Sequence, residues 1–260
     1  MTNAFELLDT AWVDQMFSSV RRVAVGPIAE GPGIVQLKAL GARVSVLEVD
    51  GDRVLVDTGI RGSGPVIAAG MGSAQRAMED ISLLVVTHYH PDHSGALAAV
   101  SRRAGAPVAA HVSESGILDG TDPTPNPYSN RLLAAVANPF TRRLNGGSVQ
   151  ISHRLEDGQA LPIGTGVRVI HTPGHTSGSI SLLSEEHGWL VVGDAMQHRF
   201  GKLSGPAAAV TVDREAARNS LKKILEFDFD SIWFSHFPPI RQGAKQRLER
   251  LVDSFESRGQ

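Results

Sequence analysis

Apolar runs that end abruptly in polar side chains recur along this chain. The run 81–86 is followed at once by the polar segment 87–95, and similar runs precede residues 172–176, 193–194 and 235–236. Short apolar runs bounded by turn-forming residues are typical of buried strands. The pattern therefore predicts strands that deliver polar side chains to one edge of a sheet, where open α/β folds carry their chemistry.

Strands and helices alternate over the rest of the chain. The pattern predicts strands over 23–25, 34–37, 44–49, 54–56, 107–111 and 231–235, and three more between 167 and 194. Asp50-Gly51 is a hairpin-turn signal. Helices are predicted over 73–80, 96–104, 131–144, 213–226 and 241–257. Connections are predicted over 59–71 and 119–130, where glycine or proline is frequent.

Four potential metal ligands fall within the segment that follows 81–86: His88, His90, Asp92 and His93. His88 and His90 are two residues apart, so in extended backbone they point the same way and can reach one cation. Asp92 and His93 follow the bend at Pro91 and are better placed for a second cation. A lone histidine is more often packed or solvent-facing, but this cluster predicts a metal site.

Further candidate ligands stand at three other predicted strand ends: His175, Asp194 and His236. The series His-x-His-x-Asp-His, Pro-Gly-His, Gly-Asp and a late His resembles the metallo-β-lactamase-fold hydrolase superfamily. Within it, Asp194 resembles the bridging aspartate of the lactonase and glyoxalase II branches. The resemblance covers nearly the whole chain, from the segment 54–59 to His236.

The resemblance implies an α/β fold, the four-layer αββα sandwich, with residues 1–260 as a single domain. It also implies a site for two divalent transition-metal ions, zinc first, although iron, manganese or cobalt would suit the same donors. The implied ligands are His88, His90 and His175 for one ion, Asp92, His93 and His236 for the other, and Asp194 as the bridge.

Asp57 matches the family's aspartate in the strand-end sequence Asp-Thr-Gly, which orients ligating imidazoles. The alternative is an aspartate that only stabilises the turn before Gly59. His111 ends a predicted strand on the side of the ligands but has no place among the seven, so we interpret it as structural or orienting. His171 and His187 are interpreted as structural or exposed.

Hydrolysis is the chemistry that the resemblance implies. Two cations bridged by Asp194 lower the pKa of a shared water, so that hydroxide forms near neutral pH and attacks a substrate carbonyl. Asp92, at the edge of the site, is the expected catalytic proton shuttle.

The expected substrate is a small ester or lactone, and an acyl-homoserine lactone is one candidate. Alternatives on the same fold stay open: a thioesterase of the glyoxalase II type, an iron-dependent dioxygenase, a β-lactamase-like enzyme, a nuclease, or a binding module without turnover. Segments 119–145 and 195–203 are the candidates to line the pocket, and the residues considered are Tyr128, Phe140, Arg142, Arg143 and 197–200. A helix packed outside the sandwich, with its arginines in water, is the alternative for the first segment.

The amino-acid composition restricts the classes of partner that this protein is expected to bind. Lys and Arg number 25 against 27 Asp and Glu, and no basic tract is present, which argues against nucleic acid as a partner. Apolar runs are too short to cross a membrane, and residues 1–22 lack the features of a signal peptide, so we expect a cytoplasmic protein. The chain has no cysteine, so thiolate ligands are excluded. A small-molecule substrate is the expected partner, and self-association is left open.

Overall fold

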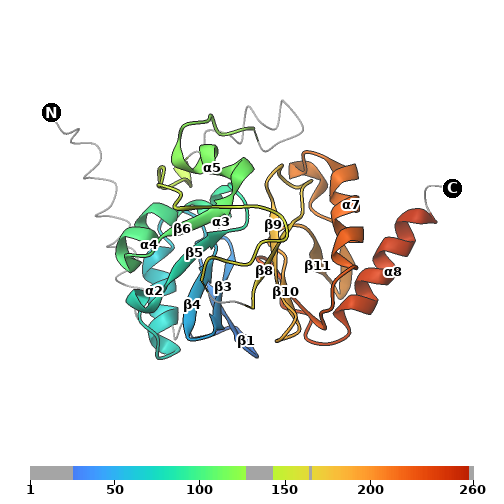
Figure 1. Ribbon diagram of the computed structural model, residues 1–260, viewed down its shortest axis with the longest axis horizontal. Coiled ribbons are helices and arrows are strands. Elements are labelled where there is room, and N and C mark those ends of the chain that lie inside the picture. The colour runs from blue at the N-terminus through green and yellow to red at the C-terminus, as the bar shows by residue number, and fades with distance from the viewer. Residues whose placement is uncertain (1–25, 127–142, 164–165, 258–260) are drawn as a thin grey trace.

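Two β-sheets pack face to face, and helices cover the outer face of each (Figure 1). This computed structural model describes residues 26–126, 143–163 and 166–257. The predicted αββα sandwich is confirmed. The predicted strand 23–25 and most of the predicted helix 131–144 lie outside the described residues, and the single domain over 1–260 stays a prediction.

The first sheet changes from antiparallel to parallel along its width. Its strands lie in chain order: β1 (Ala29–Gly31), β2 (Ile34–Lys38), β3 (Arg43–Val49), β4 (Asp52–Val56), β5 (Leu83–Val86), β6 (Val108–His111) and β7 (His153–Leu155). The pairs from β1 to β4 are antiparallel and those from β4 to β7 are parallel. The hairpin predicted at Asp50-Gly51 joins β3 to β4, and both residues have the positive φ that a tight hairpin turn requires.

The second sheet is built from the C-terminal half of the chain. Its order is β13 (Ser231–Trp233), β10 (Trp189–Val191), β9 (Ile180–Ser184) and β8 (Arg168–His171). β10 and β13 are parallel, so the residues that follow them leave at the same edge. A separate hairpin is formed by β11 (Gln197–Arg199) and β12 (Lys202–Ser204).

Three apolar cores separate the four layers. One lies between the sheets and combines Val54 and Leu83 with Val169, Leu182 and Trp189. The second lies beneath α2 (Gly64–Ser73), α4 (Leu97–Ala104) and α5 (Val112–Asp119), and the third beneath α7 (Arg214–Ile224) and α8 (Ala244–Glu256). No described helix has the length and apolar character needed to cross a bilayer.

Two local predictions are wrong. The stretch 59–71 was predicted as a connection, but α2 occupies much of it, and the predicted helix 73–80 contains only a short 3₁₀ turn at Met78–Asp80. Pro65 stands in the first turn of α2, where its fixed φ is favourable, and Ile67 and Met71 are fully buried. Burial against the sheet therefore overrides the low helix propensity of glycine. The helix α5 over 112–119 was not predicted either.

Candidate metal centre

The polar segment after β5 turns sharply between its two pairs of predicted ligands. Helix α3 (Pro91–Ser94) begins at Pro91, and His90 directly precedes it. His88 therefore lies before the turn, whereas Asp92 and His93 lie within the helix. The predicted change of chain direction between the two pairs is confirmed.

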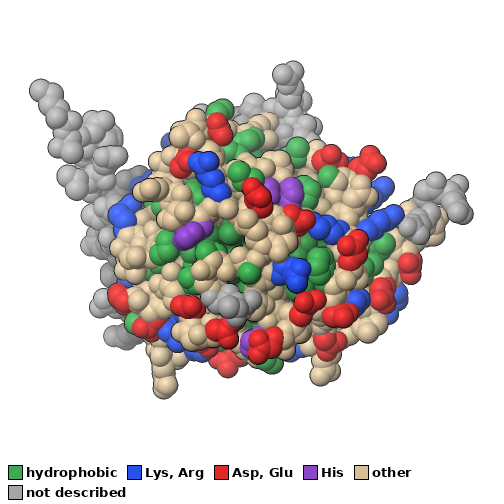
Figure 2. All heavy atoms as spheres, in the orientation of Figure 1, with side chains coloured by type: hydrophobic (Ala, Val, Ile, Leu, Met, Phe, Trp, Pro, Cys, Tyr) green, Lys and Arg blue, Asp and Glu red, His purple; other side chains and the backbone are tan. Residues whose placement is uncertain are grey.

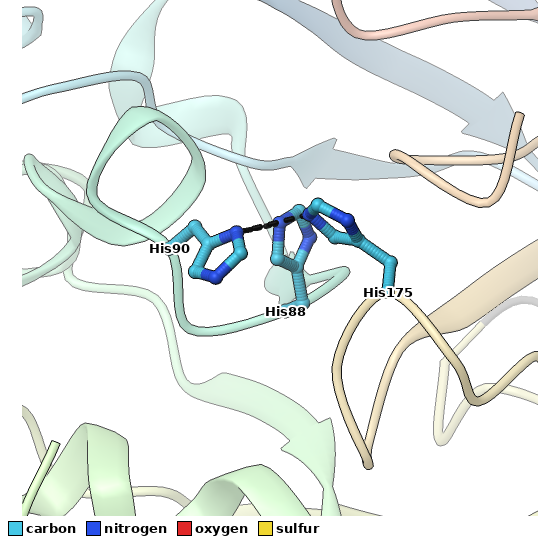
Figure 3. A group of neighbouring side chains, drawn as sticks. All are labelled: His88, His90 and His175. Atoms are coloured by element: carbon cyan, nitrogen blue, oxygen red, sulfur yellow. Dashed lines mark hydrogen bonds between the residues drawn. The ribbon is translucent and has the colours of Figure 1, made fainter. Parts of the chain in front are cut away.

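Three buried histidines converge at the first position (Figure 3). Nε2 of His88 lies 3.1 Å from Nδ1 of His90, and Nε2 of His175 lies 2.9 Å from the same atom. A tetrahedral zinc ion with bonds of about 2.0–2.1 Å sets nitrogen ligands roughly 3.3 Å apart. The three nitrogens thus have close to the spacing that one cation needs.

A second group forms from Asp92, His93 and His236 beside the first. Oδ2 of Asp92 lies 3.3 Å from Nε2 of His236 and 3.9 Å from Nε2 of His93. Nε2 of His93 is buried and makes no hydrogen bond within the described part of the chain. Because a buried polar atom without a partner is costly, this nitrogen has the environment of a metal ligand.

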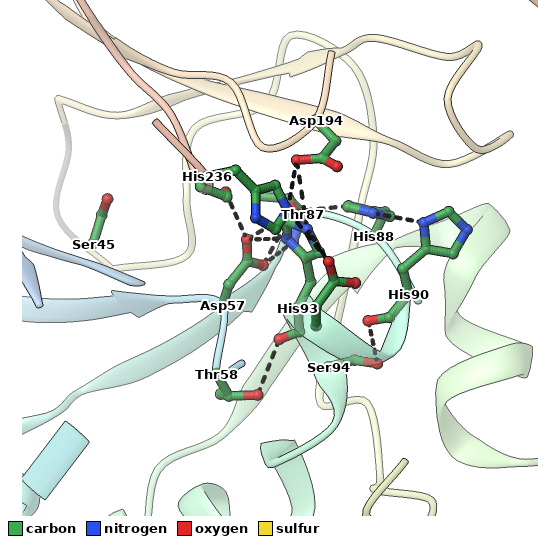
Figure 4. A network of polar contacts seen from close by, with 12 residues as sticks. Ser45, Asp57, Thr58, Thr87, His88, His90, His93, Ser94, Asp194 and His236 are labelled. Atoms are coloured by element: carbon green, nitrogen blue, oxygen red, sulfur yellow. Dashed lines mark hydrogen bonds and ion pairs between the residues drawn. The ribbon is translucent and has the colours of Figure 1, made fainter. Parts of the chain in front are cut away.

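Asp194 contacts residues of both groups, and Figure 4 shows it beside His236. Its Oδ1 lies 3.5 Å from Nε2 of His93 and 3.4 Å from Nε2 of His236, while its Oδ2 lies 3.6 Å from Nε2 of His175. The two oxygens of one carboxylate therefore face different groups. This is the arrangement expected of a bridging ligand.

The donor set fits divalent metal ions. Among the described residues, three overlapping sets could each hold an ion: His88, His90 and His175; His88, His93 and Asp194; and Asp92, His93 and His236. Imidazole nitrogens and carboxylate oxygens without a thiolate suit zinc and several other transition metals. All seven predicted ligands belong to these sets.

Asp57 contacts His93 directly and is linked to His88 through Thr87 (Figure 4). Its Oδ2 lies 2.7 Å from Nδ1 of His93, and its Oδ1 accepts a hydrogen bond from the backbone N–H of Thr87 at 2.8 Å. The Thr87 hydroxyl lies 2.9 Å from Oδ2 of Asp57 and 3.1 Å from Nδ1 of His88. Asp57 therefore contacts the cluster, as the orienting role predicts.

Comparison with known proteins agrees with this geometry. The sequence profile of the metallo-beta-lactamase superfamily matches residues 38–236. The chain belongs to that superfamily. It is 32% identical over 221 residues to the probable metallo-hydrolase YflN of Bacillus subtilis, covering 78% of this chain and 83% of that protein. It is 31% identical over 170 residues to the human acyl-coenzyme A thioesterase MBLAC2, covering 60% of this chain and 59% of that protein.

Solved structures of the superfamily share the fold. A metallo-beta-lactamase family protein from Thermus thermophilus matches with a TM-score of 0.63 and 23% identity, covering 90% of this chain and 79% of that one. A subclass B3 metallo-beta-lactamase of Bradyrhizobium japonicum matches with a TM-score of 0.63 and 17% identity, covering 92% of this chain and 96% of that one. At these identities the likeness shows the fold alone.

Glu114 is a buried residue next to the candidate metal centre that was not identified from the sequence. Its fully buried carboxylate accepts hydrogen bonds from the N–H of Tyr89 at 2.8 Å, the hydroxyl of Thr176 at 2.7 Å and the N–H of Gly178 at 2.9 Å. Tyr89 stands between two ligands and Thr176 follows His175, so one side chain ties both ligand-bearing loops together. A Cβ on Gly178 would lie 2.5 Å from Cγ of Glu114, so only glycine allows this approach.

The two groups of candidate ligands differ in charge. Burial lowers the pKa values of His88, His90 and His175, and that of His90 falls to about 3, so these rings are neutral. Burial also acts to lower the pKa of His93 and of His236, but neighbouring carboxylates outweigh it. The pKa of His93 rises to about 9 and that of His236 to about 10.

His111, His171 and His187 belong to none of the candidate metal-binding sets among the described residues. The ring of His111 stacks on that of His171, with centroids 4.0 Å apart, and its Nδ1 accepts a hydrogen bond from the N–H of Ser113 at the start of α5. His187 contacts the hydroxyl of Ser184 through Nδ1 at 3.0 Å in a hairpin turn. The interpretation of His111 as structural agrees with these contacts.

The predicted pocket segments are only partly described. Tyr128, Phe140 and Arg142 lie outside the described residues, and Arg143 is exposed. In the second segment, 197–199 forms β11, and Phe200 at the hairpin tip is 97% exposed.

Proposed function

We propose that this chain is a two-metal hydrolase that cleaves the ester or lactone bond of a small molecule. The observation that carries the proposal is the position of Asp194, whose two oxygens face the two groups of histidines. In this proposal Asp194 bridges two ions that act on one substrate. Such ions, when bound, lower the pKa of water and polarise a carbonyl oxygen.

The side chains would contribute in different ways. His88, His90 and His175 would hold one ion as neutral imidazoles, and Asp92, His93 and His236 would hold the other. Asp194 would be the ligand shared by both ions. The Asp92 side chain is 37% exposed, whereas that of Asp194 is 14% exposed. Because Asp92 combines contact with the centre and access to solvent, its Oδ2 is the atom that we assign to carry a proton to the leaving group.

Surface charge favours a small substrate over a nucleic acid. RNA or DNA recognition needs several cationic contacts along the phosphate backbone. Figure 2 shows basic and acidic side chains interspersed on one face, without a continuous basic band. The total of 25 basic and 27 acidic residues also argues against a nucleic-acid substrate.

A thioester is the second candidate substrate, and the relationship to the human acyl-coenzyme A thioesterase favours it. A thioester presents the same carbonyl to the same centre and differs in its leaving group. The two candidates are separated by comparing kcat/KM for an oxygen ester and a thioester of the same acid.

The decisive experiment combines metal analysis with a substrate panel of lactones, aryl esters, thioesters, phosphodiesters and β-lactams. We expect about two metal ions per chain, hydrolysis of a lactone or ester, and loss of activity on chelation that is restored by added metal. Asp253→Asn, at an exposed position of α8, is the control that should retain full activity. A metal content near zero in protein prepared without chelators would contradict the two-metal site. Oxygen consumption with bound iron and no hydrolysis would favour the dioxygenase.

A further inference from the structure

Two cationic side chains stand directly opposite each other beside the metal centre. Lys38, at the end of β2, pairs with Arg43, at the start of β3, in the antiparallel register. Side chains at directly opposed positions lie on the same face of a sheet, and like charges placed there are destabilising. The pair next to them on this face, Gln36 and Ser45, is fixed in place by Gln36, which donates to the carbonyl of Phe234 at 2.9 Å. Lys38 and Arg43 thus lie on the face that turns toward residues 234–236.

No acidic side chain in the described part of the chain compensates this pair. Arg53 and Arg76, by contrast, both bind the Glu48 carboxylate, at 3.0 and 2.6 Å. The Arg43 guanidinium makes no ion pair or hydrogen bond with any described residue, and its partial burial lowers its pKa. Two like charges without an acidic partner among the described residues are an unfavourable arrangement.

The pair lines a groove of about 310 Å³ that reaches the metal centre. Ile28, Ser235 and His236 also line it, and His236 is one of the proposed ligands. The backbone N–H of Arg43 donates to the carbonyl of Ser235 at 2.6 Å, which fixes the strand beside that ligand. At the turn between the strands, a Cβ on Gly41 would lie 3.5 Å from Cβ of Asp92. The cations therefore stand at the side of the centre where a substrate's acyl or leaving group can extend.

We propose that Lys38 and Arg43 bind an anionic group of the substrate while its carbonyl lies at the metal centre. This inference rests on the proposed function and narrows it to esters, lactones or thioesters that carry a carboxylate or a phosphate. The planar fork of an arginine binds either group through two hydrogen bonds, and a lysine adds a point charge. A bound anion would also offset the repulsion between the two cations.

Matched substrates test the charge preference. The 4-nitrophenyl esters of butyrate, of succinate with one free carboxylate, and of 3-phosphonopropionate are compared by kcat/KM with the metal-loaded protein. We expect the wild type to favour at least one anionic ester over the neutral one by about tenfold or more, and Arg43→Gln and Lys38→Gln each to remove about tenfold of that preference. Arg102→Gln, at an exposed position of α4, changes the net charge equally and should leave the preference intact. Comparison of the succinate ester with the 3-phosphonopropionate ester shows whether the groove prefers a carboxylate or a phosphonate.

The melting temperatures of the variants distinguish an anion-binding role of Lys38 and Arg43 from a structural role. Because each substitution removes one of two like charges, Arg43→Gln and Lys38→Gln should keep or raise the melting temperature while the preference falls. Hydrolysis of the neutral ester with no anionic preference, or an equal preference in all variants, would overturn the anion site and leave the hydrolase proposal standing.

A direct binding measurement covers the case in which no ester is cleaved and the proposed function fails. Calorimetry then compares glutarate, which has two carboxylates, with butyrate, which has one, on the metal-loaded protein. Tighter glutarate binding that is lost in Arg43→Gln would support the anion site. Equal binding of both acids by the wild type would overturn it.

Discussion

Oδ2 of Asp57 lies 2.7 Å from Nδ1 of His93, and this contact leaves Nε2 of the same ring facing Asp92 and Asp194. A carboxylate behind a ligating imidazole fixes its orientation and raises its basicity. Asp57 itself has a φ of 63°, in the left-handed region that aspartate and asparagine tolerate better than most residues. Aspartate therefore suits both the backbone conformation at this position and the contact with His93.

Replacing Asp57 by asparagine should weaken metal binding without unfolding the protein. Asparagine tolerates the positive φ and keeps the side-chain shape, but it loses the charge that supports His93. We expect metal affinity to fall by about 10- to 100-fold. Metal content after dialysis against a graded chelator measures this. Affinity equal to that of the wild type would show that Asp57 only stabilises its turn.

Replacing Glu114 by glutamine should destabilise the fold and loosen the metal centre. Both carboxylate oxygens accept hydrogen bonds, so an amide NH₂ must face either the N–H of Tyr89 or the donors from Thr176 and Gly178. A buried donor left without an acceptor costs about 1–3 kcal/mol. Chemical denaturation should show this loss of unfolding free energy. Glu185→Gln is the matched control, because that carboxylate is 52% exposed and should contribute less than about 1 kcal/mol. Equal losses in the two variants would contradict the role of Glu114.

The candidate ligands could be located in the sequence because they follow the ends of apolar runs. His88 and His90 follow β5 in sequence, and the parallel pairing of β10 with β13 brings Asp194 and His236 to the same edge. An apolar run followed by polar residues is a local pattern, so it can be recognised in the sequence without knowledge of distant contacts. The change of direction at Pro91 is equally local.

Glu114 and α2 were not predictable for the opposite reason. The Glu114 carboxylate bonds to Thr176, which is 62 residues away in sequence, and no local pattern marks an acidic residue as buried. In α2, glycines that favour a connection are held in a helix by packing: a Cβ on Gly70 would lie 3.4 Å from the side chain of Leu37 in β2. In both cases tertiary contacts determine the local structure or the burial, and local propensity does not depend on these contacts.

Replacing Asp92 by asparagine should separate proton transfer from metal binding. Asparagine keeps a carbonyl oxygen near His236 but cannot carry a proton, so we expect kcat to fall by about two to four orders of magnitude. Metal content should fall less than in His90→Ala, because His90 lies at the convergence of the three-histidine group. Turnover close to that of the wild type in Asp92→Asn would remove this residue from the proton-transfer role.

The metal-free protein should be most stable near neutral pH. The pKa values of His93 and His236 are raised in the folded state to about 9 and about 10, so their stabilisation is complete below the unfolded value of about 6.5 and is lost as pH rises through 9–10. Buried His88, His90 and His175 have lowered pKa values, so they destabilise the fold as pH falls below about 6.5. Melting temperatures of the protein after removal of metal by a chelator, measured from pH 5 to pH 10, test the expected loss of stability at both low and high pH. A melting temperature that rises steadily from pH 7 to pH 10 would contradict the assignment.

The two metal ions should differ in how their binding depends on pH. The rings of His88, His90 and His175 are neutral above pH 7 and lose no proton to an ion, whereas His93 and His236 are protonated at that pH and must release theirs. Calorimetric titration of the metal-free protein, in two buffers of different ionisation enthalpy, counts the protons released in each step. At pH 7 we expect fewer protons to be released with the first ion than with the second, so raising the pH toward 9 should strengthen the second step more than the first. His236→Gln removes one of the two titrating rings and should reduce the total release by about one proton. Equal proton release in both steps would show that the two groups of ligands do not differ in charge, and the assignment of a neutral and a protonated group would be wrong.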